Sequence, residues 1–190
     1  MNAPAEIPVM KGWTVPFFPM RPANGPRLTR KLTLDILERM ADHRFLYQPK
    51  LNGDRALLAI VDKRVIVCNR HYGWYHYQVA NVLAFQAKCK SGTLFDGEVF
   101  KGNFYPFECL ALEGRSFKAN TVEERALMAM QMCRLAKVEW LFKEPTKAWL
   151  LKGSAHLPQF EGVVRKRADI PYLLLPNASG TSSGWLKHRW

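Results

Sequence analysis

Hydrophobic residues recur along this chain in short runs separated by turn residues, a pattern typical of β-strands. The strands predicted from these runs cover residues 45–50, 55–61, 65–68, 93–100, 104–112, 138–142, 160–166, 172–175 and 185–189. Asp62-Lys63 and Lys101-Gly102-Asn103 lie between consecutive runs and predict tight turns. The strands on either side of each turn are therefore expected to pair in the antiparallel direction.

Helical patterns are fewer. Thr121, followed three residues later by Glu124, forms a capping-box signature at the start of an apolar segment. The predicted helices cover residues 33–42, with Thr33 as N-cap, 78–88, and the segment from Thr121 to about Lys137.

No internal repeat, low-complexity tract or linker interrupts the chain. Residues 1–30 are rich in Pro, Gly and aromatic residues and predict an extended lead-in that packs through its aromatic side chains. Residues 177–184 predict a polar loop. The expectation is one α+β domain over residues 1–190, with mostly antiparallel sheets flanked by helices.

Charge and cysteine usage narrow the function classes. The chain has 28 Lys and Arg against 16 Asp and Glu, a formal net charge of +12, which favours polyanionic partners such as nucleic acid or nucleotides. The four cysteines are too widely spaced for a zinc site or a disulfide framework, which favours a reducing compartment. No signal peptide or bilayer-length apolar segment is recognised. We therefore expect a soluble protein, cytoplasmic or nucleoid-associated, without a membrane partner.

The segment from Lys50 to Arg55 is the first candidate for chemistry. A lysine ends one predicted strand, Gly53 opens a turn, and an arginine begins the next strand, so both cations can face one cleft. A lysine amine is a poor nucleophile at neutral pH because its ordinary pKa is about 10.4. Neighbouring cations disfavour its protonated form. Alone, this hexapeptide is more often a surface hairpin.

Three further segments place charge on predicted strands. Asp96-Gly97-Glu98 puts two carboxylates into an apolar strand, where they require cations or hydrogen-bond donors. Glu161 opens another apolar strand, and together with Glu98 it can offer oxygen ligands to a divalent cation. Lys187 and Arg189 lie two residues apart on one strand face and can meet phosphate.

In this order the segments resemble the motifs of the covalent nucleotidyltransferases, a family of DNA ligases, RNA ligases and mRNA capping enzymes. The matching segments are 50–55 (motif I), 69–73 (Ia), 94–100 (III), 104–110 (IIIa), 161–166 (IV) and 182–189 (V). The last resembles the DNA ligase form SxxWLKxK. Each motif is weak alone, but six in the family order, from residue 48 to 189, form a specific pattern.

Four positions depart from the usual family pattern. Asn52 stands where motif I has aspartate, and Gln48 stands where DNA ligases commonly have glutamate. Glu108 replaces an aspartate, and Arg189 replaces the second lysine of motif V while keeping its charge. Gln48 can still donate or accept a hydrogen bond to a base. Relatives also carry an OB-fold domain after motif V, which is not recognised before Trp190. Three interpretations stay open: the domain works alone, a partner supplies the OB-fold functions, or the sequence is a piece of a longer protein.

The resemblance implies the adenylation domain of an ATP-dependent DNA ligase, acting in DNA repair or replication. Lys50 would attack ATP to form lysyl-AMP with the help of Mg²⁺, and AMP would pass to the 5′-phosphate of nicked duplex DNA. The implied residues are Lys50 and Lys187 for catalysis; Gln48, Arg55, Glu98, Phe107, Glu161, Lys187 and Arg189 for the nucleotide; Glu161 and Glu98 for the metal; and Arg70 for the nucleic-acid phosphate.

Three alternatives stay open at this point. An RNA ligase would share nearly every motif, and the Trp185-Leu186-Lys187 form of motif V favours DNA only modestly. A capping enzyme would use GTP in place of ATP. A non-catalytic nucleic-acid-binding relative would fit Asn52 and the missing OB-fold domain.

Overall fold

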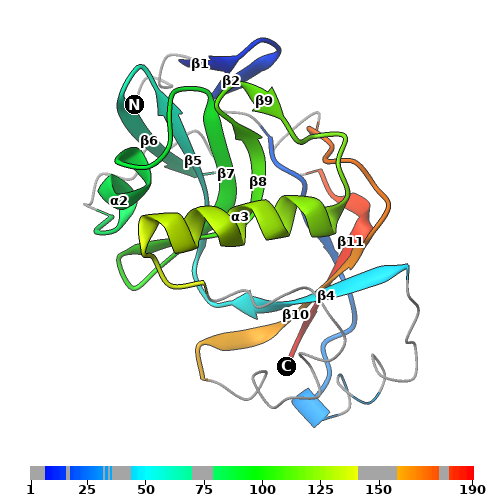
Figure 1. Cartoon of the computed structure of the whole chain (residues 1–190). Coiled ribbons are helices and arrows are strands. Elements are labelled where there is room, and N and C mark those ends of the chain that lie inside the picture. Colours follow the sequence, from blue (N-terminus) through cyan, green and yellow to red (C-terminus); the bar gives the residue numbers. More distant parts are fainter. Residues whose placement is uncertain are drawn as a thin grey trace, which may run out of the picture.

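A computed structural model describes residues 7–15, 18–31, 33, 35, 44–69, 79–140, 158–175 and 180–190. These residues form a structure that is mostly sheet with few helices (Figure 1). Its strands are β1 Ile7–Met10, β2 Trp13–Val15, β3 Pro22–Asn24, β4 Phe45–Leu51, β5 Asp54–Val61, β6 Arg64–Asn69, β7 Thr93–Phe100, β8 Asn103–Leu112, β9 Arg115–Ser116, β10 Phe160–Arg167 and β11 Ser182–Arg189. The two helices with defined bounds are α2 Val82–Gln86 and α3 Val122–Ala136.

The larger sheet has five strands in the order β6-β5-β7-β8-β9, and every neighbouring pair is antiparallel. Two-residue turns join its long hairpins. Asp62 and Lys63 both adopt positive φ, 47° and 63°, as do Lys101 and Gly102 at 47° and 74°. These backbone values match the twist of two-residue hairpins, so local turn residues set the register of the sheet.

The smaller sheet has four strands in the order β3-β11-β10-β4. β11 and β4 each pair antiparallel with β10, while the short β3 runs parallel to β11. This sheet joins strands that are far apart in the sequence, so it forms only when the two ends of the described chain come together. A separate hairpin of β1 and β2 completes the strand arrangement.

Helix α3 packs against β8 of the five-stranded sheet (Figure 1). Its start is fixed by reciprocal hydrogen bonds: Thr121 Oγ1 accepts from the Glu124 amide at 3.2 Å, and the Glu124 carboxylate accepts from the Thr121 amide at 2.9 Å. The helix ends at Ala136, and the C-cap residue Lys137 adopts a left-handed backbone conformation that closes the last turn.

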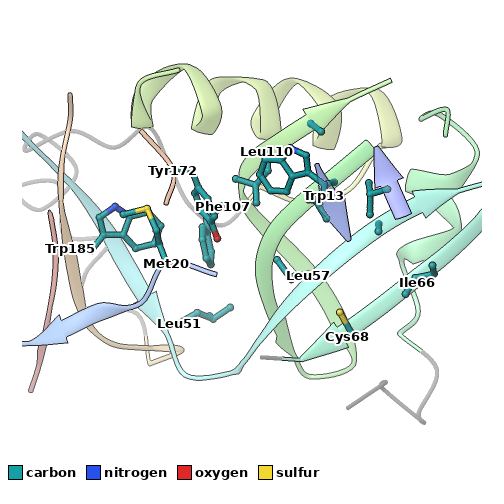
Figure 2. Close-up of a cluster of buried hydrophobic side chains, with 14 of the residues drawn as sticks. Trp13, Met20, Leu51, Leu57, Ile66, Cys68, Phe107, Leu110, Tyr172 and Trp185 are labelled. Carbon is teal, nitrogen blue, oxygen red and sulfur yellow. The ribbon is translucent and has the colours of Figure 1, made fainter. Parts of the chain in front are cut away.

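One hydrophobic cluster continues from one sheet to the other. Figure 2 shows Trp185 and Met20 on the side of the four-stranded sheet and Leu57 on the side of the five-stranded sheet, with Phe107 and Tyr172 between them. A second cluster, which includes Phe85 and Phe95, fills the space among α2, α3 and the other face of the five-stranded sheet. The sheets are thus held together by packed side chains as well as by the charges described below.

Most predicted strands, both predicted turns, the antiparallel pairing and the helix begun by the capping box are confirmed. Residues 172–175 are not a strand: the Tyr172 amide donates to the Lys118 carbonyl at 2.7 Å and the Leu175 amide to that of Phe18 at 2.9 Å. These bonds to two separate loops replace a strand ladder. Residues 138–140 are also not a strand, while 141–142 lie outside the described residues.

The structure also changes the predicted ends of two helices and one loop. Thr33 is not an N-cap, because helical backbone is already present at Arg30 and the Thr33 amide donates to the Thr29 carbonyl at 2.9 Å. The helix expected within 78–88 is confined to α2, and β11 begins inside the predicted loop, at Ser182. The lead-in contains the β1–β2 hairpin and buries Trp13 as predicted. Residues 36–42 lie outside the described parts of the chain.

All four cysteines are free and buried. Within the described ranges, no helix is both long enough and apolar enough to cross a membrane.

The capping box gives a direct test of this part of the fold. We expect Thr121→Ala to lower the free energy of unfolding by about 1 kcal/mol, because it removes the side-chain acceptor of the Glu124 amide. Urea unfolding followed by circular dichroism would measure the change. Thr181→Ala, at an exposed position just before β11, is the matched control and should change stability by less than about 0.5 kcal/mol. Equal effects of the two substitutions would contradict the assignment.

Candidate active site

Strand register places the predicted lysines on one face of the four-stranded sheet. Residues directly opposite each other in an antiparallel pair lie side by side on the same face, and residues two apart on a strand share that face. Across β11, β10 and β4 this gives three rows: first Arg189, Gly162 and Lys50; second Lys187, Val164 and Gln48; third Trp185, Lys166 and Leu46. Consecutive rows are about 7 Å apart.

The first row holds the candidate nucleophile, Lys50. Its ammonium forms an ion pair with the Glu161 carboxylate, which also accepts a hydrogen bond from Arg189 Nε at 3.2 Å. Burial alone would raise the pKa of Glu161, but the hydrogen bond and charge of Lys50, with Arg189, lower it. Glu161 is therefore an ionised carboxylate shared by the two cations of this row.

Glycine is required at the centre of the first row. A Cβ atom added to Gly162 would lie 2.0 Å from the His188 carbonyl oxygen, which is far closer than van der Waals contact. The register of β10 against β4 also shifts between Phe160 and Gly162, and this irregularity lies at Glu161. The glycine and the irregularity together explain how the Glu161 side chain reaches the cations on both sides of β10.

A second carboxylate approaches Lys50 from the five-stranded sheet. Glu98 accepts a hydrogen bond from the Gly53 amide at 2.9 Å, in the turn that links β4 to β5. Burial raises the pKa of Glu98, while the charge of Lys50 and the Gly53 amide act in the opposite direction. Lys50 thus lies in the field of Glu98 as well as in contact with Glu161.

Arg55, which the sequence assigned to the nucleotide, is held in place by a buried carboxylate. Both Nε, at 2.8 Å, and an outer nitrogen of its guanidinium donate to the Asp96 carboxylate, which also accepts from the Tyr172 hydroxyl at 2.6 Å. Burial would lower the pKa of Arg55, but the fully buried Asp96 raises it. Burial outweighs these partners at Asp96 itself and raises its pKa. The two acids of β7 are therefore paired as expected: Asp96 with Arg55, and Glu98 with the Gly53 amide.

Phe107 reaches the space between the sheets through a β-bulge. The register of β7 against β8 shifts between the pairs Asp96–Glu108 and Gly97–Pro106, so Phe107 is the additional residue. Its ring meets Trp185 edge-on, with centroids 6.4 Å apart, and the Arg55 guanidinium lies 5.0 Å from its centroid. Only 7% of Phe107 is exposed, so protein side chains cover most of the ring.

A buried charge chain links the sheets next to Phe107. Glu108 accepts from Arg125 Nε of α3 at 2.7 Å and from the Lys166 ammonium of β10. None of these three side chains is more than 2% exposed. Burial alone would raise the pKa of Glu108, but Arg125 and Lys166 lower it. For Lys166, burial outweighs the attraction of Glu108 and lowers its pKa to about 8.

Gln48 occupies the second row beside Val164. It is 2% exposed, and its Nε2 finds no hydrogen-bond partner among the residues that the structure describes. A buried amide donor without a partner is costly, so a ligand acceptor at this position would relieve the cost. Trp185 Nε1, in the third row, is similarly buried and without a partner within the described chain.

The carboxylates can be assessed as metal ligands. No group of three or more His, Cys, Asp or Glu side chains in the described parts of the chain is arranged to hold an ion. Mg²⁺, however, is commonly bound through one or two carboxylates together with substrate phosphates and water. Glu161 and Glu98, which both act on Lys50, fit such a shared site.

The sequence did not assign Lys166, Arg125 or Tyr172 to the site. The available clue was Glu108 in the middle of the apolar run 104–112, because a buried carboxylate requires cations. Lys166 also follows Gly162 and Val164 at every second position, so it shares their strand face. Arg70, the residue expected to contact nucleic-acid phosphate, lies outside the described residues.

Comparison with solved structures identifies the fold. A mycobacterial DNA ligase D complexed with ATP and MES superposes with a TM-score of 0.67 at 17% identity, over 91% of this chain and 60% of that chain. The ligase domain of M. tuberculosis LigD gives a TM-score of 0.58 at 16% identity, over 91% and 59%. Pmar-Lig gives 0.60 at 19% identity, over 93% and 47%.

The chain therefore has the fold of a DNA ligase nucleotidyltransferase domain, and it spans about 60% of the length of the two ligase D structures. No protein-family model and no curated protein match the sequence.

The buried charge chain predicts a large loss of stability when its acid is neutralised. Glu108→Gln should lower the free energy of unfolding by about 3–5 kcal/mol at neutral pH, because Arg125 and Lys166 would be left buried without their counterion. Since the pKa of Glu108 is lowered on folding, its contribution is present above the ordinary carboxyl range and is lost as the pH falls through the folded-state value.

Glu113→Gln is the matched control, because Glu113 forms an exposed ion pair with Lys90 and should contribute less than about 1 kcal/mol. Chemical denaturation of both variants would measure the difference. A loss no larger for Glu108→Gln than for Glu113→Gln would show that the buried pairing is not formed.

Proposed function

We propose that this chain is the catalytic core of an ATP-dependent polynucleotide ligase that forms lysyl-AMP on Lys50 and seals nicks in duplex DNA. The observation that carries this proposal is the placement of Lys50 in the first row, where it forms an ion pair with Glu161, which also contacts Arg189, and where it acts electrostatically on Glu98. The ligase fold supports it, since the whole arrangement lies on the fold's two central sheets.

ATP would lie along the three rows. Its phosphates would lie at the first row, and its base would lie toward the second and third rows. Gln48 in the second row offers a buried amide to the edge of adenine, and Phe107 offers its ring for stacking. Since Phe107 is 7% exposed, a neighbouring side chain must turn away for the base to stack on it. Arg55, anchored by Asp96, and Glu98 would hold the ribose.

The reaction is an in-line displacement at the α-phosphorus. Lys50 first gives up one proton to solvent. Its nitrogen then forms a bond to phosphorus while the bond to the bridging oxygen breaks, so that pyrophosphate leaves with that electron pair and the nitrogen loses its second proton to solvent. Lys187 and Arg189, on the same sheet face as Lys50, would stabilise the charge that develops on the phosphate oxygens. The product is a phosphoramidate between Lys50 and AMP.

Glu161 and Glu98 would hold Mg²⁺ together with the phosphates of the nucleotide. A bound Mg²⁺ supplies neutralisation of phosphate charge in such sites. Both carboxylates already act on Lys50, so metal binding and the position of the nucleophile are expected to depend on each other.

The later steps are carried by resemblance to the ligases. AMP would move to the 5′-phosphate of a nick, with Arg70 as its contact, and the 3′-hydroxyl would then displace AMP. The excess of 28 basic over 16 acidic residues suits binding to a nucleic-acid backbone that depends on salt and not on base sequence. A partner or a further domain would supply OB-fold functions.

Covalent labelling tests the proposed chemistry. Incubation with Mg²⁺ and ATP labelled at the α-phosphate should leave label on the protein in a denaturing gel, and Lys50→Ala should abolish it, because that substitution removes the attacking nitrogen. Lys90→Ala is the control, since Lys90 is an exposed lysine remote from the three rows. GTP labelled in the same way should give a weaker signal.

Label retained by Lys50→Ala would overturn the assignment of the nucleophile. ATP binding without any adduct would instead favour a non-catalytic relative, and stronger labelling by GTP would favour a capping activity.

The nucleic-acid substrate is tested separately. Matched nicked duplexes of DNA and of RNA, each with a labelled 5′-phosphate at the nick, should be compared under identical salt, because binding to the backbone depends on salt. We expect sealing of DNA to be faster. Faster sealing of RNA, with normal adduct formation, would keep the enzyme class and replace the substrate.

A further inference from the structure

The third row contains a cation that no step above uses. Lys166 is 2% exposed, and its ammonium lies 3.9 Å from the centroid of the Trp185 ring and 4.5 Å from that of Phe107. Its hydrogen bond to Glu108 ties this contact to α3 through Arg125. The ammonium therefore joins two aromatic rings that come from different sheets.

We propose that Lys166 is a positioning residue for the nucleotide base: its charge holds Phe107 and Trp185 in the orientation that receives the base. This inference rests on the proposed function. A cation over an aromatic face is attracted by the ring quadrupole, and the attraction is strongest when water is excluded, as it is here. The Arg55 guanidinium also lies over both rings, 5.0 Å from the Phe107 centroid and 5.6 Å from that of Trp185, but the Lys166 ammonium is the nearer cation to each. Without the charge of Lys166, both rings lose their nearer cation.

Because of its position, Lys166 is expected to affect the binding of the nucleotide and not the reaction at Lys50. It lies two rows, about 13 Å along the strand direction, from the row of Lys50. At that distance it cannot touch the reacting atoms. Loss of its charge should therefore weaken nucleotide binding and leave the maximal rate of adduct formation nearly unchanged.

Lys166 lies among charged and titratable groups, and it is expected to change charge above neutral pH. Those that act on it are Glu108 of β8, Asp96 of β7 and Arg55 of β5, while Arg125 and Tyr172 act through the two acids. The pKa of the Glu108 carboxyl is lowered by Arg125 and Lys166, burial raises the pKa of Asp96, and the pKa values of Arg55 and Tyr172 are raised. The pKa of Lys166, about 8, falls within reach of an ordinary assay.

The experiment measures adduct formation with labelled ATP from about pH 6.5 to 9.5, a range that brackets this pKa. The ATP concentration for half-maximal rate should rise about tenfold through pH 8 in the unmodified protein, since a desolvated cation–π contact contributes that much. Lys166→Arg keeps its charge at all these pH values, so its ATP concentration for half-maximal rate should stay at the low value that the unmodified protein has below pH 8. For Lys166→Met, which has no charge, that concentration should stay at the high value over the whole pH range.

The effects of pH on ATP and on the rest of the site are common to all three proteins, so only the difference among them reports on Lys166. Circular dichroism at each pH verifies that the variants are folded. If Lys166→Met does not fold, the comparison between the unmodified protein and Lys166→Arg is sufficient to test the inference. Equal pH dependence in the unmodified protein and Lys166→Arg would overturn the inference, as would a change in the maximal rate alone. Absence of any adduct in the unmodified protein would instead contradict the proposed function itself.

Discussion

The arrangement depends on one buried carboxylate, Glu108. It accepts hydrogen bonds from Arg125 of α3 and from Lys166 of β10, and it lies at the end of the bulge that carries Phe107. Removing one partner of a buried ion pair leaves the other charge uncompensated, so each member fixes the others. This join holds the four-stranded sheet against the five-stranded one, and the placement of Lys50 near Glu98 depends on that contact.

The site face changes character along the strands. Its first row is charged and partly exposed, and both of its cations, Lys50 and Arg189, contact the Glu161 carboxylate. Its third row is dry and aromatic, with Lys166 enclosed by rings. A nucleotide has the same gradient, from a highly charged triphosphate to a flat apolar base, and the match between the two gradients gives the proposed orientation its physical basis.

Local sequence was sufficient for much of this structure. Turn residues such as Asp62 and Lys63, and the capping box at Thr121, encode hairpins and a helix through short-range hydrogen bonds and backbone conformation. The order of the charged segments indicated that Lys50, Glu98 and Glu161 would meet, and the structure brings these three together.

Contacts between distant segments were harder to predict. Lys166 and Glu108 are 58 residues apart, and nothing local indicates which cation a buried acid will find. Tyr172 has the pattern of a strand, yet it lies in a loop whose backbone amides donate to two other loops, and its hydroxyl donates to Asp96, 76 residues away. From the sequence, one can expect each buried carboxylate to be paired with a lysine or an arginine. The sequence does not indicate which lysine or arginine that is.

A crystal structure with bound ATP would test the central claim most directly. The account predicts the triphosphate at the first row, with the Lys50 nitrogen about 3–3.5 Å from the α-phosphorus, and the base reaching toward Gln48 and Phe107. A nucleotide bound elsewhere, or bound with its base beside Lys50 and its phosphates beside Lys166, would contradict it.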